Sequence, residues 1–291
     1  MIAYRISLAE LEQLIDAEKT TWRSRAKQRT AKFKRAGKYS ESSSIWGEVK
    51  QVYMRLQGGS KCIYCERKME AGVASGPEQD VEHYRPKGNV AAWSVPAALS
   101  HLSFTAAPGK GYHVLAYHLF NYSSSCKPCN EVLKSDFFPI AGAYRLTGED
   151  PSQMKDEKPY LIFPFGDLDE DPETLIGFHG IAPQALAASG FQRERALVTI
   201  HFFLLHDTEQ RKNLVLERAR TIITLFPFLK TLKGRASAAT KTEAREIIGL
   251  FTSPKAPHTN CARCFERLFQ SQPQQAKQVF DDARNLIRSN S

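Results

Sequence analysis

The sequence has no run of eighteen consecutive apolar residues, the length that a membrane-spanning helix needs. It also lacks an apolar leader, because its opening residues, MIAYRISLAELEQLID, carry charges where a secretory signal peptide is uncharged. No internal repeat and no low-complexity tract interrupts it. We therefore expect a cytoplasmic protein without a membrane partner.

A length of 291 residues, with 42% apolar and 24% charged side chains, is enough for one large domain or two small ones with a hydrophobic core. The formal net charge of +9 favours polyanionic partners. Residues 19–38 contain nine basic residues and no acidic one. Two interpretations of this segment stay open: a solvated helix face, or an arm that contacts phosphates.

No cysteine is left over, because the six cysteines fall into three C-x-x-C pairs. In a reducing compartment this pattern indicates metal binding rather than disulfides. Two thiolates three positions apart can bind one metal ion from a single turn, and two such turns complete a tetrahedron with no open position. A thioredoxin-type redox motif is the alternative. The first two pairs therefore predict one structural Zn²⁺ site with the ligands Cys62, Cys65, Cys126 and Cys129.

The third pair, Cys261 and Cys264, is preceded by His258. These three side chains are candidate ligands of a second zinc ion, but a fourth ligand is not visible nearby. The residues FERLF after Cys264 have the pattern of an amphipathic helix. We therefore expect two partly buried thiols on a C-terminal helix.

Glu82 and His83 are adjacent in the segment DVEHYRPK, which lies between the first two cysteine pairs. A carboxylate is a hard oxygen ligand for Mg²⁺. An imidazole titrates near neutrality and can take a proton from water. This pair is therefore a candidate for metal-assisted hydrolysis.

Two asparagines and a lysine accompany the second cysteine pair. Asn130 directly follows Cys129 and stands four residues before Lys134, so both lie on one face of a helix whose first turn the zinc would fix. Asn121 lies five residues before Cys126, where its side chain can brace a strand connection by hydrogen bonds to the backbone.

These residues resemble the HNH, or ββα-metal, nucleases in the form built on a four-cysteine zinc knuckle. The shared pattern is C-x-x-C, then (D/E)-H with a nearby proline, then N, then C-x-x-C-N-x-x-x-K. It is matched by Cys62, Cys65, Glu82, His83, Pro86, Asn121, Cys126, Cys129, Asn130 and Lys134. More narrowly, the segments EHYRPK, CNEVLKSDFFPI and ERALVTIHFFLLHDTEQRKNLVLERAR are similar to the HNH subunit of Septu-type anti-phage systems, also found with some retrons.

The resemblance implies catalytic roles for four residues. His83 would be the general base, Glu82 and Asn130 would ligate a catalytic Mg²⁺ or Mn²⁺, and Asn121 would orient the loop and His83. Lys134 stands where some members have a further metal-ligating histidine.

Three basic residues are candidate substrate contacts. Because a protonated lysine cannot ligate a metal, Lys134 is expected to contact phosphate. Arg85 and Lys87 are further candidates, with long solvated side chains as the alternative.

The implied activity is an endonuclease that hydrolyses phosphodiester bonds in nucleic acid, with DNA favoured, and works beside an ABC/SMC-like ATPase subunit. Three alternatives stay open. The chain could be a zinc-stabilised nucleic-acid-binding or adaptor subunit without cleavage, a tRNA-cleaving nuclease, or a thiol oxidoreductase.

The expected fold class is α+β, with a ββα-metal, treble-clef-like core and structural zinc inside a mainly helical protein. We expect a basic helical region over 1–57, the HNH core over 58–145 with an insertion from Gly88 to His118, and a mainly helical region over 146–291. The local pattern predicts a capped helix from about residue 8, a helix from Trp46 to Leu56, a strand at 160–165, a solvated acidic turn at 167–173, and helices within 192–229, 236–251 and 274–287.

Overall fold

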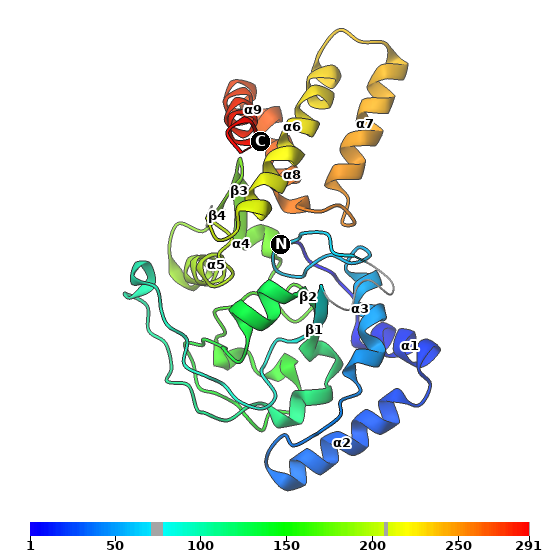
Figure 1. Ribbon diagram of the computed structural model, residues 1–291, viewed down its shortest axis with the longest axis vertical. Coiled ribbons are helices and arrows are strands. Elements are labelled where there is room, and N and C mark those ends of the chain that lie inside the picture. The colour runs from blue at the N-terminus through cyan, green and yellow to red at the C-terminus, as the bar shows by residue number, and fades with distance from the viewer. Residues whose placement is uncertain (71–77, 207–208, 291) are drawn as a thin grey trace.

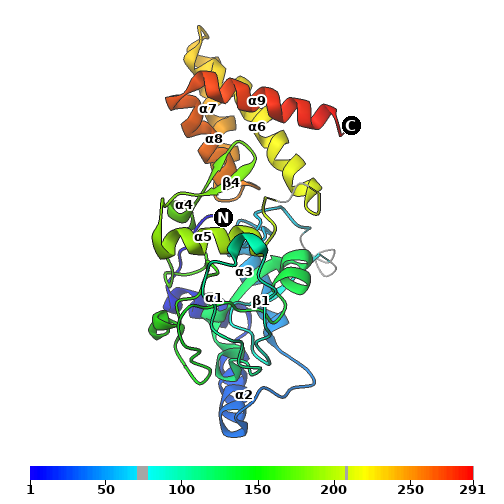
Figure 2. The ribbon, with the colours of Figure 1, turned by 90° about the vertical axis from the view of Figure 1, so that its left-hand side faces the viewer.

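The computed structural model describes residues 1–70, 78–206 and 209–290. The molecule is elongated, with the first helices of the chain at one end, a group of long C-terminal helices at the other, and a small sheet between them (Figure 1). A view turned by 90° keeps these groups at opposite ends (Figure 2). Within the described residues the β-structure consists of two separate two-stranded sheets in a mainly helical chain.

Helix α1 (Leu8–Glu18) begins where the sequence predicts. The Ser7 hydroxyl accepts a hydrogen bond from the Glu10 backbone N–H at 3.2 Å, and the Glu10 carboxylate accepts one from the Ser7 N–H at 2.9 Å. These two bonds form the predicted capping box. Leu11 and Ile15 lie about one turn apart and are fully buried, so they fix the helix on the core.

The basic segment 19–38 forms helix α2 (Trp22–Ala36), which buries Trp22 and Phe33. Much of its charge, unbalanced in the sequence, is balanced in the fold by acids from other segments. The ion pairs are Arg23 with Glu12 and Asp16, Arg25 with Glu48, Arg29 with Glu41, and Lys34 with Glu149.

The predicted helix from Trp46 to Leu56 is confirmed, as a short 3₁₀ segment η1 (Trp46–Val49) that leads into helix α3 (Lys50–Leu56). The chain then turns at Gly58 and Gly59, which have φ angles of 74° and 71°. A Cβ atom added to Gly58 would lie 2.7 Å from the carbonyl oxygen of Pro254. Glycine is needed at this turn because the backbone approaches the C-terminal part of the chain closely.

The first sheet pairs β1 (Gln79–His83) with β2 (Tyr122–Cys126) in antiparallel register, with His83 opposite Tyr122. Strand β2 is buried along its whole length. After Cys126 the chain enters η6 (Pro128–Lys134), which is wound as a π-helix. Here the Ser135 N–H donates to the Asn130 carbonyl oxygen at 2.6 Å. Such π-turns are rare and are frequent at functional sites.

The expected insertion, Gly88 to His118, contributes no strand to either sheet; its strand-like pairing in the described chain is an isolated bridge between Ala91 and Phe137. Buried side chains such as Tyr112 and Leu115 anchor it to the core. The Ala91 N–H donates to the Asp136 carbonyl oxygen at 3.0 Å, which ties the insertion to the segment after η6. Its short 3₁₀ segments are η3 (Ala97–Leu99) and η4 (His113–Tyr117), and η5 (Leu119–Asn121) directly follows it.

The prediction of a strand at 160–165 is wrong. The run is buried, but its only strand-like pairing in the described chain is an isolated bridge between Tyr4 and Phe165. The Tyr4 N–H donates to the Pro164 carbonyl oxygen at 2.8 Å, and no neighbouring strand extends this pairing into a ladder. An apolar run shows burial, and pairing depends on what lies beside it. Two 3₁₀ segments precede this run, η7 (Pro151–Gln153) and η8 (Lys155–Glu157).

The acidic segment 167–173 is more than the solvated turn that the sequence predicts. Asp169 contacts the guanidinium of Arg195 at 2.5 Å, and Arg195 is 4% exposed. Glu170 lies 3.2 Å from the same guanidinium. Part of the acidic segment therefore neutralises a buried cation.

The predicted C-terminal helices are confirmed. The structure adds a short helix at 172–175 and a hairpin that follows it. Strands β3 (Ile176–His179) and β4 (Ala182–Ala185) form the second sheet and turn at Gly180, whose φ is 59°. The helices are α4 (Pro172–Leu175), α5 (Gly190–Phe202), α6 (Lys212–Lys233), α7 (Ala238–Thr252), α8 (Thr259–Ser271) and α9 (Pro273–Arg288).

One hydrophobic core connects the described chain, from Leu11 in α1 through Tyr122 in β2 to Ala283 in α9. The three regions expected at 1–57, 58–145 and 146–291 all contribute to it. Among the described residues, none of the helices has both the length and the apolar character needed to cross a bilayer.

The turn at Gly58 gives a test of this packing. Gly58→Ala should lower the free energy of unfolding by about 3 kcal/mol, because a positive φ costs about 1–2 kcal/mol and the backbone clash adds to it. Gly37→Ala is a matched control, since Gly37 has a φ of 65° and no atom within 4 Å of an added Cβ. Urea denaturation measures both, and equal losses would contradict the close approach.

Candidate functional site

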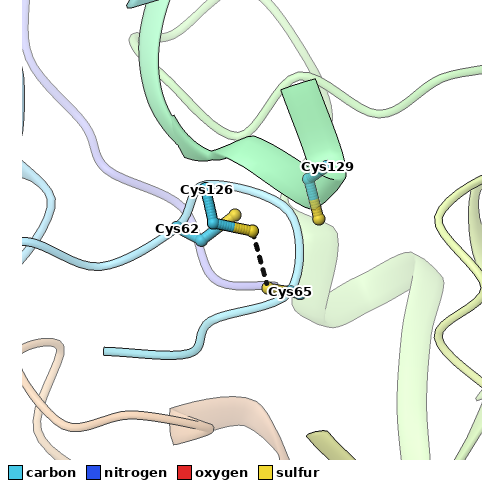
Figure 3. Close-up of side chains that lie close together, drawn as sticks. All are labelled: Cys62, Cys65, Cys126 and Cys129. Carbon is cyan, nitrogen blue, oxygen red and sulfur yellow. Dashed lines mark hydrogen bonds between the residues drawn. The ribbon is translucent and has the colours of Figure 1, made fainter. Parts of the chain in front are cut away.

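The four cysteines of the predicted zinc site come together in the fold. All four are buried, and their sulfur atoms lie within 4.8 Å of one another (Figure 3). The Cys65 and Cys126 sulfurs are 3.8 Å apart. A tetrahedral zinc with bonds of about 2.3 Å requires sulfur atoms about 3.8 Å apart, whereas a disulfide requires about 2.05 Å. This cluster can hold a structural zinc ion.

Local hydrogen bonds shape the turn that carries Cys62 and Cys65. The Glu66 N–H donates to the Cys62 carbonyl oxygen at 3.1 Å, which closes the turn. The Ile63 N–H donates to the Ser124 carbonyl oxygen at 3.1 Å, which attaches the turn to β2. The other two ligands come from the junction between β2 and η6, so zinc would join this turn to the start of η6.

Arg211 is a neighbour of the cluster that sequence reasoning missed. Its Nη2 atom lies 3.5 Å from the Cys129 sulfur. Burial acts to lower the pKa of this guanidinium, but the nearby cysteine sulfurs outweigh burial and raise it. Four thiolates and one Zn²⁺ carry a net charge of −2, so a permanent cation here offsets part of the buried charge. The sequence gives no signal for this contact, because Arg211 lies far along the chain.

Glu82 and Lys134 form a buried ion pair. The Glu82 carboxylate is 1% exposed, and its Oε1 atom lies 3.4 Å from Lys134 Nζ and 3.3 Å from the Tyr64 hydroxyl. Burial raises the pKa of Glu82 to about 7, although the Lys134 ammonium opposes this shift. Lys134 is fully buried and also donates to the His83 carbonyl oxygen at 3.4 Å. The Lys134 ammonium is therefore bound by oxygen atoms of the protein. Lys134 could make the expected phosphate contact only if its side chain moved.

His83 ends β1 and packs between two aromatic rings. Its ring centroid is 4.8 Å from that of Trp46 and 4.9 Å from that of Tyr122, both in edge-to-face geometry. Its Nε2 atom lies 3.2 Å from the Ala116 carbonyl oxygen. A carbonyl only accepts, so Nε2 carries the proton and Nδ1 keeps the lone pair. Burial and the nearby Lys87 hold the pKa of His83 well below its usual value, so the imidazole is neutral.

Asn121 braces the backbone on both sides of the site. Its Oδ1 accepts from the Arg85 N–H at 2.8 Å, and its Nδ2 donates to the carbonyl oxygens of Arg85 and Leu115 at 3.0 and 3.1 Å. The side chain is fully buried. These three bonds hold the segment after His83 against the insertion.

Asn130 lies in the π-helical turn η6, one residue after Cys129. Its half-buried side chain forms no hydrogen bond with any residue that the structure describes, so its amide is available to a ligand. The turn ends at Ser135, which has a φ of 39° and is not glycine. A non-glycine residue at positive φ stores strain, and such residues gather at functional sites.

The side chains of Arg85 and Lys87 lie in different environments. Arg85 is 4% exposed, and its Nε atom donates to the buried Glu157 carboxylate at 2.8 Å. Glu157 also accepts from the Tyr112 hydroxyl at 2.6 Å. Arg85 is thus held in a buried ion pair rather than facing a phosphate. Lys87 is half-buried, with its ammonium 4.6 Å from the Trp46 ring centroid.

Comparison with known proteins gives this chain no relative: no family model matches it, and neither does any curated protein or solved structure. The chemistry of the site therefore rests on its residues. The fold brings Glu82, Lys134 and the His83 carbonyl together beside the cysteine cluster, and places Lys87 close enough to influence Glu82 and His83 electrostatically.

The third cysteine pair lies on α8, and both thiols are buried. The Cys261 sulfur donates to the Gly180 carbonyl oxygen at 3.3 Å, and the Phe178 N–H donates to the Cys264 sulfur at 3.3 Å. His258 points elsewhere and lies 2.9 Å from Glu217. These thiols attach α8 to the β3–β4 hairpin.

Zinc content tests the cysteine cluster. The purified protein should contain about one zinc ion per chain, and Cys65→Ser or Cys129→Ser should lose zinc and most of the stability of the surrounding fold. Zinc binding of this type contributes roughly 10–16 kcal/mol. Cys264→Ala serves as the control, because its thiol lies on α8. Elemental analysis and thermal unfolding measure both effects, and full zinc occupancy in the serine variants would contradict the assignment.

The buried pair of Arg85 and Glu157 gives a second test. Arg85→Met should lower stability by about 3–5 kcal/mol, because it leaves a buried carboxylate uncompensated. The double variant Arg85→Met/Glu157→Met should recover much of this loss, because an apolar pair can replace a buried ion pair. Chemical denaturation measures the series. Unchanged stability of Arg85→Met together with weaker nucleic-acid binding would instead restore Arg85 as a phosphate contact.

Proposed function

We propose that this chain is a metal-dependent nuclease of the HNH type, which hydrolyses phosphodiester bonds in nucleic acid. The observation that carries the proposal is the contact between two segments that are distant in sequence, β1 and η6. Lys134 Nζ lies 3.4 Å from Glu82 Oε1 and 3.4 Å from the His83 carbonyl oxygen. Because η6 begins within the cysteine cluster, that cluster sets where both Lys134 and Asn130 lie.

The state of His83 supports its role as the general base. The hydrogen bond from Nε2 to the Ala116 carbonyl leaves Nδ1 with a free lone pair, which can take a proton from water. The lowered pKa keeps the imidazole unprotonated at neutral pH. Such a base is always in the required protonation state, although a low pKa makes it a weaker proton acceptor.

A divalent cation belongs to the proposal, and the chemical type of the candidate donors fits one. The Glu82 carboxylate, the His83 carbonyl and the Asn130 amide are hard oxygen donors of the kind that Mg²⁺ and Mn²⁺ prefer. In the structure, the Lys134 ammonium contacts the Glu82 carboxylate and the His83 carbonyl oxygen, where the divalent cation would bind. When bound, the ion would neutralise charge on the scissile phosphate and on the leaving oxygen. Glu82 and Asn130 would hold it, with Lys134 displaced toward the phosphate.

The surroundings suit a polyanionic substrate. Lys87 places a cation near both Glu82 and His83. On α2, Lys27, Lys32 and Arg35 stay exposed, in addition to the ion-paired cations of that helix. We propose DNA as the substrate and, from the resemblance, an ABC/SMC-like ATPase as the partner in anti-phage defence.

One observation favours a second candidate function. Glu82 and Lys134 are both buried and satisfy each other's charge, which is also how a purely structural ion pair behaves. The chain would then be a zinc-stabilised nucleic-acid-binding or adaptor subunit that does not cleave.

The function is tested by replacing His83 with a side chain of similar size. His83→Gln should reduce Mg²⁺-dependent cleavage of plasmid DNA by roughly 10² to 10⁴, the usual effect of removing a general base. EDTA should abolish the cleavage by wild type. Cleavage is followed by gel electrophoresis with plasmid and with tRNA, alone and with the co-purified partner.

His101→Gln is the matched control, because His101 is exposed and lies outside the site. Zinc content and thermal unfolding confirm that each variant is folded. Cleavage that His83→Gln retains at the wild-type rate would remove His83 as the base. Absence of cutting in every condition would favour the adaptor function.

A further inference from the structure

The C-terminal helices carry an excess of positive charge that the proposed cleavage site does not use. From Lys212 to the last residue there are fourteen basic and six acidic residues. This region lies at the end of the molecule opposite α2, with β1 and β2 between them (Figures 1 and 2). A phosphate chain is the polyanion that such a charge excess attracts most generally.

A groove of about 550 Å³ lies in this region between α6, the α6–α7 connection and α9. Its lining includes four charged residues, all of them cations, and no acidic residue. They are Lys230 on α6, Arg235 on the connection, and Lys277 and Arg284 on α9.

Few of these cations are neutralised. Lys230 and Arg235 are exposed and form no ion pair within the described chain. Lys277 and Arg284 share a single carboxylate, that of Asp281. The groove therefore keeps a net positive charge and has at least two cations free to pair with a ligand.

Two stacked phenylalanines hold the cations in place. Phe226 and Phe280 stack with ring centroids 4.2 Å apart at an angle of 17°. Lys230 lies over Phe226, and Lys277 and Arg284 lie over Phe280, at 5.5–5.9 Å from the ring centroids. These contacts position the long side chains at the groove, which lowers the entropy cost of binding a ligand.

We infer that this groove binds the phosphate backbone of a nucleic acid, at a surface separate from the site of cleavage. The inference rests on the proposed function for the identity of the polyanion. Lys277 and Arg284 are seven residues apart on one face of α9, which is roughly 10 Å along the helix axis. One strand of a duplex presents a phosphate about every 3.4 Å along its axis, so this face spans about three phosphates.

The lining argues for phosphates over an acidic protein partner. Protein interfaces are built around apolar side chains that insert into pockets. Here Phe226 is buried against Phe280, and the groove offers cations at its surface instead. A ligand with evenly spaced charges and no apolar anchor matches this arrangement.

The test measures binding of a fluorescent 30-base-pair DNA duplex to the full chain in EDTA, where cleavage plays no part. A groove variant replaces the four cations by glutamine: Lys230→Gln, Arg235→Gln, Lys277→Gln and Arg284→Gln. It should weaken binding about tenfold or more at low salt. It should also reduce the slope of log K against log salt by about 3–4, since each of the four lost phosphate contacts removes about 0.9.

The matched control removes the same charge from C-terminal positions outside the groove, through Lys241→Gln, Arg245→Gln, Lys255→Gln and Arg288→Gln. Binding that falls equally in both variants, or that is unchanged in the groove variant, overturns the inference. So does displacement of the duplex by poly-L-glutamate as effectively as by unlabelled DNA, which would make the groove a site for acidic polypeptides. Thermal unfolding checks that both variants are folded.

The two proposals fail separately. Groove-dependent binding without any Mg²⁺-dependent cutting would overturn the nuclease and leave a nucleic-acid-binding protein. Cutting that depends on His83, together with unchanged binding by the groove variant, would overturn the groove alone.

Discussion

The convergence of four cysteine sulfurs is the constraint on which the rest of the site depends. Two turns separated by sixty residues meet there, and closing a loop of that length costs on the order of 4 kcal/mol of chain entropy. Zinc binding of roughly 10–16 kcal/mol exceeds this cost by a wide margin. The metal can therefore fix the start of η6, and with it the direction in which Lys134 extends toward Glu82 in β1. Without that junction, the short strands β1 and β2 would have little to hold them in register, because an isolated two-stranded pair is marginal.

Buried charge is the second theme of the molecule. Glu82 pairs with Lys134, Glu157 with Arg85, and Asp169 with Arg195, and each pair brings together residues that are distant in sequence. Removing both charges from water is costly, so such pairs contribute little net stability, but breaking one leaves an expensive unpaired ion. They therefore specify which segments lie together. The same property sets the electrostatics of the site, where burial raises the pKa of the Glu82 carboxyl to about 7 and keeps the His83 imidazole neutral.

Local signals in the sequence were reliable, and signals that depend on distant partners were not. The capping box at Ser7 and the cysteine spacing each specify a geometry within a few residues, and the fold realises both. The apolar run 160–165 predicted burial correctly and pairing incorrectly, because a strand needs a partner that the run does not encode. The charge of Lys134 and Arg85 suggested exposure, yet both side chains are buried. Each forms an ion pair with a carboxylate that is distant in sequence, Glu82 and Glu157 respectively. For Arg211 there was no local signal at all.

Helix α6 connects the cysteine cluster with the cationic groove. Arg211 directly precedes the first residue of α6 and lies beside Cys129, and Lys230 near the other end belongs to the cationic groove. The helix has 22 residues, which is roughly 33 Å along its axis, and it contains Pro227 near its C-terminal end. One helix therefore sets the distance between the cysteine cluster and the cationic groove.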